Sequence, residues 1–144
     1  MITLREITAE SLRSIIDLKV AENQKSFVKP NAVSIAQAYF DKNAWFRAIY
    51  DGEAPIGFVM LWLDTEKAEY WLWRFMIDEK FQKKGFGYQA MKIIIEHVRI
   101  LPNATRFGLT YASGDGDPSQ FYAKLGFVET GEWQDDQKVM MLEL

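Results

Sequence analysis

Apolar and polar residues alternate along the chain with two different periods, and the changes of period mark predicted strands and helices. Between residues 45 and 63 two strands flank Asp51 and Gly52, a pair typical of a hairpin turn. The second of these strands has apolar residues on both of its faces, so we expect it to be central in a sheet. Further strands are predicted over residues 2–6, 70–77 and 106–111, and a closing hairpin over residues 128–133 and 138–142.

Other segments carry the helical period. A helix is predicted over residues 9–20, and Ser34 is the predicted N-cap of a short helix that ends at Phe40. The longest helix is predicted to start near Phe86, with an apolar stripe that should lie on the sheet and includes Met91, Ile94 and Val98. Strands and helices that alternate in this way predict one α/β domain over residues 1–144.

The segment that joins the strand YWLWRFMI to the longest helix has the composition of an anion-binding turn. Its sequence, DEKFQKKGFG, is basic and contains Gly85 and Gly87. The first amides of a helix lack internal partners and lie at the positive end of its dipole, and glycines let a phosphate approach the main chain. We therefore predict a phosphorylated ligand at this turn.

Two common phosphate-binding motifs do not explain the turn. A dinucleotide-binding loop has three glycines in G-x-G-x-x-G, but Ala90 takes the third position, and no early βαβ unit precedes it. The P-loop motif G-x-x-x-x-G-K-[S/T] is absent from the chain. A Rossmann-like nucleotide-binding protein stays as a weaker alternative, which predicts stabilisation by NAD.

A second aromatic motif, QFYAKLGF, follows at residues 120–127. From its residues alone, Tyr122 is best explained as a core aromatic on a short helix that Gly126 ends. A catalytic role for the same tyrosine is the alternative, and the upstream glycine turn favours that role.

Together the two motifs resemble the GNAT acyltransferase superfamily. QKKGFG matches its Q/R-x-x-G-x-G/A signature, FYAKLGF matches its FYxKxGF segment, and the element order is similar over essentially the whole chain. The resemblance implies a mostly antiparallel central sheet, flanked by helices and splayed at an acetyl-CoA site. It also implies direct acetyl transfer to an amine, with Tyr122 as the acid near the sulfur. The backbone of Phe75, Met76 and Ile77 would bind the acetyl and pantetheine portions, and Gln82, Lys83, Lys84, Gly85, Phe86, Gly87 and Tyr88 would bind the pyrophosphate.

Composition narrows the function further. The chain has 144 residues, no cysteine and one histidine, His97, which excludes disulfides, a cysteine acyl-enzyme and a histidine metal cluster, so we expect no metal. The formal charge of -3 argues against nucleic acid, and no apolar run is long enough for a membrane span. We expect a cytoplasmic protein, and we expect His97 to be a surface residue near a helix C-terminus. A homodimer is compatible with the sequence, which does not fix the oligomeric state.

The acceptor is expected to be a small amine, with a polyamine first. Several segments, DLKVAENQKSFVKPN among them, resemble bacterial spermine/spermidine acetyltransferases, and Trp71, Trp73 and Phe75 are interpreted either as a cation-π wall on one face of a strand or as core. Alternatives are another amine (an antibiotic, an amino acid or a protein N-terminus) and a CoA-binding module without turnover.

Two positions depart from the family pattern. Trp73 and Arg74 stand where polyamine acetyltransferases commonly carry an acidic residue, so the base is unassigned, with Glu22 or Glu69 as candidates through water. Asp115 stands where many relatives have an asparagine that bonds the pantetheine, and Pro118 replaces a usual alanine.

Overall fold

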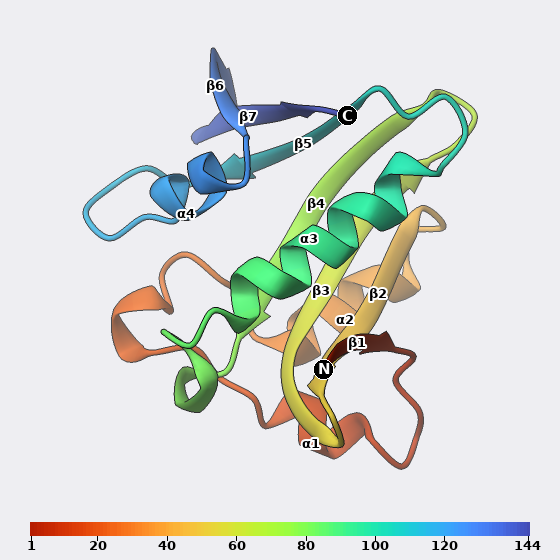
Figure 1. The fold of residues 1–144 in the computed structure, drawn as a ribbon, viewed down its shortest axis with the longest axis vertical. Coiled ribbons are helices and arrows are strands. Elements are labelled where there is room, and N and C mark those ends of the chain that lie inside the picture. The colour runs from red at the N-terminus through yellow and green to blue at the C-terminus, as the bar shows by residue number, and fades with distance from the viewer.

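The protein is described from a computed structural model that covers residues 1–144. One sheet of seven strands runs through it in the order β1-β2-β3-β4-β5-β7-β6, and only the β4–β5 pair is parallel (Figure 1). The strands are β1 (Ile2–Arg5), β2 (Ala44–Asp51), β3 (Ala54–Asp64), β4 (Glu69–Ile77), β5 (Arg106–Tyr111), β6 (Val128–Gln134) and β7 (Gln137–Glu143). The helices are α1 (Leu12–Ile16), α2 (Asn31–Tyr39), α3 (Phe86–Arg99) and α4 (Ser119–Lys124), with short 3-10 turns η1 (Glu22–Gln24) and η2 (Glu79–Phe81).

Helices cover both faces of the sheet, and each face has its own apolar cluster. Helix α3 crosses the front of β3 and β4 in Figure 1, with α1 and α2 behind. Beneath α3, its buried Met91, Ile94 and Val98 pack with the strands, as the sequence predicts. On the other face Ile15 of α1 packs with Phe58 and other buried residues of β2 to β4. The expected α/β fold with a mostly antiparallel sheet is therefore confirmed.

Strands β4 and β5 separate after a short contact. Their only paired positions are Trp71 with Gly108 and Leu72 with Leu109, whereas β5 pairs with β7 at six positions. From Trp73 to Ile77, β4 therefore has a free edge on the β5 side. The two strands diverge in Figure 1, so the sheet is splayed as the resemblance implied.

A bulge in β4 changes which side chains share a face. Met60 lies opposite Arg74 and Leu61 opposite Leu72, so Trp73 has no partner on β3. The extra residue puts Trp73 on the α1/α2 side of the sheet, while Phe75 packs against the cluster under α3. The expectation that Trp71, Trp73 and Phe75 line one face is therefore wrong.

The first helices begin and end at other residues than predicted. Helix α1 stops at Ile16, because the chain turns so that the amide of Lys19 donates to the Asp78 carboxylate at 2.9 Å. Helix α2 starts at Asn31 rather than near Ser34, and the Asn31 side chain donates to the Ile15 carbonyl at 2.9 Å. Ser34 is not an N-cap. It lies buried in the helix with no hydrogen-bond partner for its hydroxyl.

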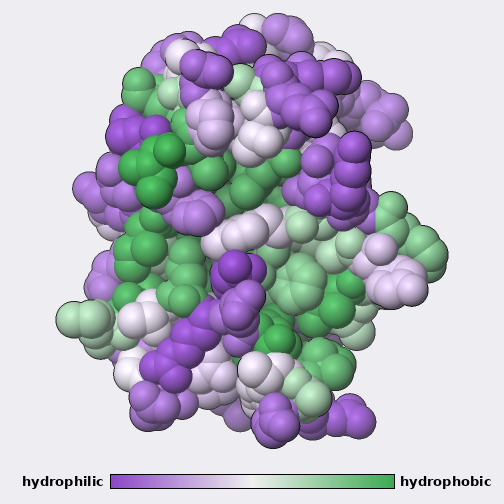
Figure 2. Space-filling model, turned by 90° about the vertical axis from the view of Figure 1, so that its right-hand side faces the viewer, coloured by the Kyte–Doolittle hydropathy of each residue, from purple (hydrophilic) through white to green (hydrophobic).

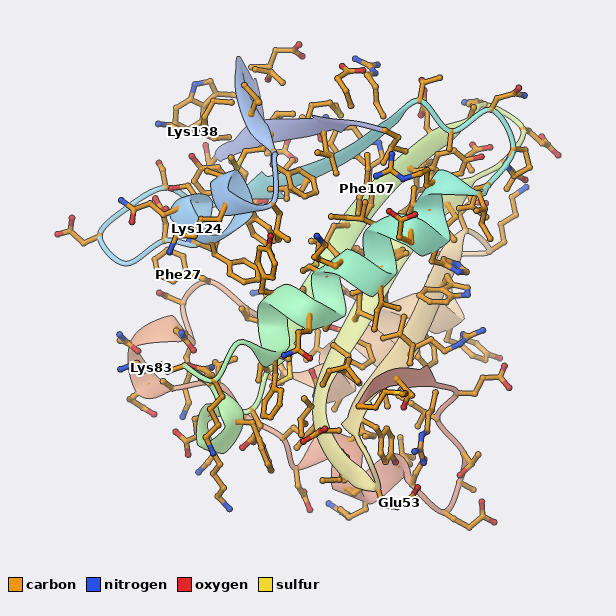
Figure 3. All side chains as sticks on the ribbon, in the orientation of Figure 1. Phe27, Glu53, Lys83, Phe107, Lys124 and Lys138 are labelled. Atoms are coloured by element: carbon orange, nitrogen blue, oxygen red, sulfur yellow. The ribbon has the colours of Figure 1, made fainter.

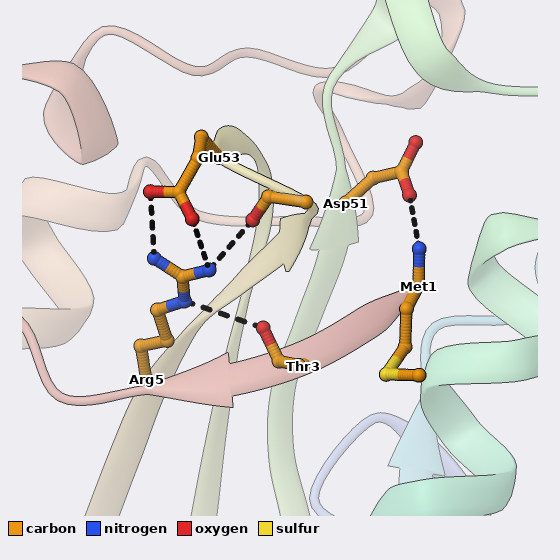
Figure 4. A network of polar contacts seen from close by, with 6 residues as sticks. Met1, Thr3, Arg5, Asp51 and Glu53 are labelled. Carbon is orange, nitrogen blue, oxygen red and sulfur yellow. Dashed lines mark hydrogen bonds and ion pairs between the residues drawn. The ribbon is translucent and has the colours of Figure 1, made fainter.

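Polar contacts fix the edge strand β1 (Figure 4). The Arg5 guanidinium donates to the Gly52 carbonyl at 2.6 Å and pairs with the Glu53 carboxylate at 3.2 Å. The N-terminal ammonium pairs with Asp51 at 3.1 Å. These contacts join β1 to the turn between β2 and β3.

The surface is polar at one end and more apolar in the middle of one face. Figure 2 shows polar side chains at the top of the molecule, where β6 and β7 lie in Figure 1, and apolar ones reaching the surface below them. None of the helices has the length and the apolar character that crossing a membrane requires.

Candidate active site

The turn between β4 and α3 is built by side-chain hydrogen bonds. Asp78 accepts from the amide of Lys80 at 3.1 Å, which starts η2. The Gln82 amide donates to the Ile77 carbonyl at 2.8 Å and to the Gln24 side chain at 2.7 Å. The glutamine of the QKKGFG motif thus holds the turn against the end of β4 and against the segment before α2.

This turn leads into α3 with its backbone amides unused. Gly85, the N-cap, has φ +83°, a left-handed conformation that favours glycine. The amide of Gln89 is the first to donate back, to the Gly85 carbonyl at 3.1 Å. The amides of Phe86, Gly87 and Tyr88 precede it in the first turn of a 14-residue helix, where the dipole adds positive potential. This arrangement fits a phosphate or pyrophosphate.

A cleft of about 1690 Å³ extends from this turn into the gap between β4 and β5. One wall comes from β4 and the glycine turn, and the other from β5, α4 and the loop before it. Residues 24–29, in the segment before α2, also line the cleft. Figure 3 shows Phe27, Lys83 and Lys124 on three separate segments around this opening, and all three line the cleft.

Tyr122 of α4 lies in the wall that faces the turn. Its side chain is buried between Phe121 and Phe127, whose rings meet it edge-on, and its hydroxyl makes no hydrogen bond within the protein. Burial raises the pKa of Tyr122 well above the ordinary value of a tyrosine, so it stays protonated at neutral pH. Next to it, Phe121 stacks on Phe75 of β4 with the ring centres 6.0 Å apart, which joins the two walls.

Most of the predicted site residues come together in this cleft. Tyr122 and the other lining residues from the prediction share one surface: Trp73, Phe75, Met76, Ile77, Gln82, Lys83, Gly85, Gly87 and Tyr88.

Four predicted residues lie outside the cleft lining. The Lys84 ammonium lies over the Phe81 ring, and Phe86 packs against the core cluster. Glu22 is exposed and pairs with Lys25 at 2.7 Å, which also lowers the pKa of its carboxyl. Asp115 is exposed on its loop. Its neighbour Asp117 lines the cleft instead.

Asp117 is held by the backbone around it. Its carboxylate accepts from the Ser119 hydroxyl at 2.6 Å and from the amide of Gly114 at 3.0 Å, and the Ser119 bond lowers its pKa. Since these hydrogen bonds occupy its carboxylate oxygens, Asp117 shapes the loop before α4.

Several lining residues escaped the sequence analysis. Tyr111 donates to the Glu129 carboxylate at 2.6 Å, and burial together with that carboxylate raises its pKa to about 12. The Trp62 indole donates to Asp41 at 3.1 Å. Only Phe27 carried a usable signal, an aromatic residue in a largely polar loop.

His97 lies in the last turn of α3, near the helix C-terminus as predicted, but it is half-buried rather than a surface residue. Its ring stacks on Trp45 with the centres 4.5 Å apart, and the Arg47 guanidinium also lies over the Trp45 ring, 4.4 Å from its centre. Burial, and then the charge of Arg47, lower the pKa of His97, which favours the neutral imidazole. The structure contains no group of three or more His, Cys, Asp or Glu side chains that could hold a metal ion.

Comparison with known proteins identifies the family. Residues 12–127 match the family described as Acetyltransferase (GNAT) family, so the chain belongs to the GNAT acetyltransferases. Among curated proteins it is similar to spermine/spermidine N(1)-acetyltransferase of Bacillus subtilis (strain 168), with 30% identity over 154 aligned positions that cover 99% of both chains.

Solved structures share the fold at lower identity. An N-acetyltransferase from Thermoplasma acidophilum, in complex with coenzyme A, superposes with a TM-score of 0.73 at 14% identity, covering 100% of this chain and 99% of that one. A dodecameric spermidine N-acetyltransferase from Vibrio cholerae gives a TM-score of 0.71 at 20% identity, covering 99% of this chain and 93% of that one.

Proposed function

We propose that this acetyltransferase carries an acetyl group from acetyl-CoA directly to a small primary amine. One observation carries the proposal: Gly87 and Tyr88 at the start of α3, the unpaired edge of β4 and Tyr122 all line the same cleft. A phosphorylated, extended acyl donor fits this order of groups. The pyrophosphate would meet the amides of residues 86–88, and the pantetheine arm would pair with β4 as an added strand.

The chemistry needs a nucleophile, a place for negative charge and an acid. The amine nitrogen loses a proton and attacks the thioester carbonyl, whose oxygen becomes an oxyanion. A backbone amide near Phe75 on the free edge of β4 is suited to stabilise that charge. When the C–S bond breaks, the departing thiolate takes the proton of Tyr122. The Tyr122 hydroxyl supports this role because it is protonated at neutral pH and has no partner within the protein, so it is free to give the sulfur a proton or a hydrogen bond, although burial, which raises its pKa, makes it a weaker acid than an exposed tyrosine.

Spermidine and spermine are the first acceptors we propose. The similarity to a curated spermine/spermidine acetyltransferase supports this choice. Glu69 lines the cleft and Glu22 does not, but Glu69 lies at the start of β4 while Phe75 lies near its other end. We therefore assign neither carboxylate as the base and propose that the amine proton leaves to water in the cleft. We also propose that the protein works in the cytoplasm and, if it self-associates, as a homodimer.

The test is thiol release from acetyl-CoA with spermidine, spermine, putrescine and a panel of monoamines and amino acids. Acceptor-dependent release, with the acetylated amine found by mass spectrometry, is the expected result. Binding of acetyl-CoA in a thermal shift assay without release from any amine would instead favour a CoA-binding module. Stabilisation by NAD and not by CoA would reject the proposal.

A further inference from the structure

We propose that Trp62, Trp71, Asp41 and Glu69 form a subsite for a second ammonium group of the acceptor, remote from the acetyl group. We call these four residues the distal subsite. The inference rests on the proposed function and adds to it the property that makes an acceptor favourable, a positive charge at its far end.

Strand register brings the four residues together. Trp62 lies directly opposite Trp71, and Asp64 lies opposite Glu69, in the antiparallel pair of β3 and β4. Because side chains two residues apart share a face, Glu69 and Trp71 lie on the same side as Trp62. Asp41, just after α2, reaches this side through its bond from the Trp62 indole. All four residues line the cleft, and both indoles are half-buried.

The charges at this end suit an ammonium. One Asp41 oxygen accepts from the Trp62 indole at 3.1 Å and the other from the amide of Asn43 at 3.0 Å, which fixes the carboxylate. Neither Asp41 nor Glu69 forms an ion pair within the protein. A cation above an indole face, beside an unpaired carboxylate, gains from both.

Arg74 brings a positive charge to the part of the cleft next to Phe75. It lies on the same face of β4, beyond the bulge and next to Phe75. Its guanidinium donates to the Gln37 side chain at 3.1 Å and to the Trp73 carbonyl at 3.0 Å, and it has no carboxylate partner. A fixed positive charge there disfavours a protonated amine near the reacting carbonyl. The acceptor would thus bind with its far nitrogen charged and its attacking nitrogen neutral, which is the form that acyl transfer needs.

Lys67 and Arg106 also border the cleft at this end. Neither pairs with Asp41 or Glu69, so both carboxylates are free to pair with a ligand.

The spacing matches an extended polyamine. From Trp71 to Phe75 there are four residues of strand, a length of about 13 Å that the bulge shortens. The terminal nitrogens of extended spermidine are nine bonds apart, which corresponds to about 11 Å. One end can therefore lie on the distal subsite while the other lies beside Phe75.

Charge removal at the carboxylates tests the subsite. The ratio of kcat/KM for spermidine to kcat/KM for an alkyl monoamine of equal length is measured in the wild type and in the double variant Asp41→Asn with Glu69→Gln. We expect this ratio to fall about tenfold, mainly through KM for spermidine, from the lost ion pairs beside the indoles. Glu10→Gln removes one exposed carboxylate that does not line the cleft and should leave the ratio unchanged. The single variant Glu69→Gln, at an exposed position, guards against a folding defect at Asp41.

A second measurement needs no turnover. Calorimetric titration of spermine into the protein with coenzyme A present should show binding that the double variant weakens by a similar factor. If amines are acetylated but the ratio does not change, the distal subsite is wrong and the proposed function stands. If no amine is acetylated but the variant weakens spermine binding, the subsite stands and the proposed function fails. No spermine binding to the wild type rejects the subsite.

Discussion

Two buried tyrosines allow a direct test of the role assigned to Tyr122. The Tyr122 hydroxyl has no hydrogen-bond partner in the protein, whereas the Tyr70 hydroxyl donates to the Pro102 carbonyl at 2.6 Å. Both side chains are less than a tenth exposed. Replacing each by phenylalanine removes a hydroxyl oxygen from two different environments. We expect Tyr122→Phe to lower activity and leave stability nearly unchanged, and Tyr70→Phe to lower stability instead.

The magnitudes follow from these environments. Tyr122→Phe breaks no bond in the free protein, so the free energy of unfolding should change by less than about 0.5 kcal/mol. Its kcat should fall about a hundredfold if the hydroxyl is the general acid. Tyr70→Phe leaves the Pro102 carbonyl without its donor and should cost about 1–2 kcal/mol. For a chain of this length each kcal/mol lowers Tm by about 3 °C.

The assay combines thermal or urea unfolding with single-turnover thiol release from acetyl-CoA at saturating amine. A Tyr122→Phe enzyme that keeps kcat within about threefold of the wild type would show that another group protonates the thiolate. A Tyr70→Phe enzyme that loses as much activity as Tyr122→Phe would show that the loss reports general packing. Either result refutes the reasoning from burial and hydrogen bonding.

Three further predictions concern the turn, the sheet and the histidine. Gly85→Ala should weaken acetyl-CoA binding in a thermal shift assay and cost about 1 kcal/mol of stability, because φ is +83° there; unchanged binding would argue that the turn does not hold the donor. Gly57→Ala should destabilise by about 3 kcal/mol or more in urea unfolding, because an added Cβ would overlap the Met76 carbonyl oxygen on the next strand; a soluble variant of wild-type stability would contradict the register. The pKa of His97 is lowered in the fold, so the unfolded chain binds the extra proton first and stability should fall as pH drops below about 6.5. His97→Phe keeps an aromatic ring on Trp45 and should remove that part of the pH dependence, which unfolding at pH 7.5 and 5.5 would measure.

The sequence predicted most strands and the glycine turn, because each has a local cause. The alternating apolar residues of β3, the Asp51–Gly52 hairpin and the apolar stripe of α3 depend on neighbours along the chain. The same is true of Gly85 and the helix start that follows it.

What escaped prediction depends on partners far along the chain. The bulge at Trp73 exists only relative to β3, so no periodicity in β4 alone reveals it. The early end of α1 depends on Asp78, 59 residues after Lys19. Asp117, rather than Asp115, lines the cleft because its bonds to Gly114 and Ser119 set the course of the loop. The pairing of Trp62 with Asp41 likewise needs the end of α2 to lie against β3.

Because β4 and β5 pair at only two positions, the sheet has two parts, β1 to β4 and β5 to β7 with β6, that are joined at one corner. Gly108 lies at that corner, where an added Cβ would lie 2.7 Å from the Trp71 ring, so the indole fills the space that a side chain would occupy. Beyond Leu72 no backbone hydrogen bond between the two strands limits their separation. A ligand that pairs with the free edge of β4 and also contacts α4 would supply the missing crosslink. Amide hydrogen exchange in β4 and α4 should then slow together on binding, as expected when an extended ligand completes the sheet.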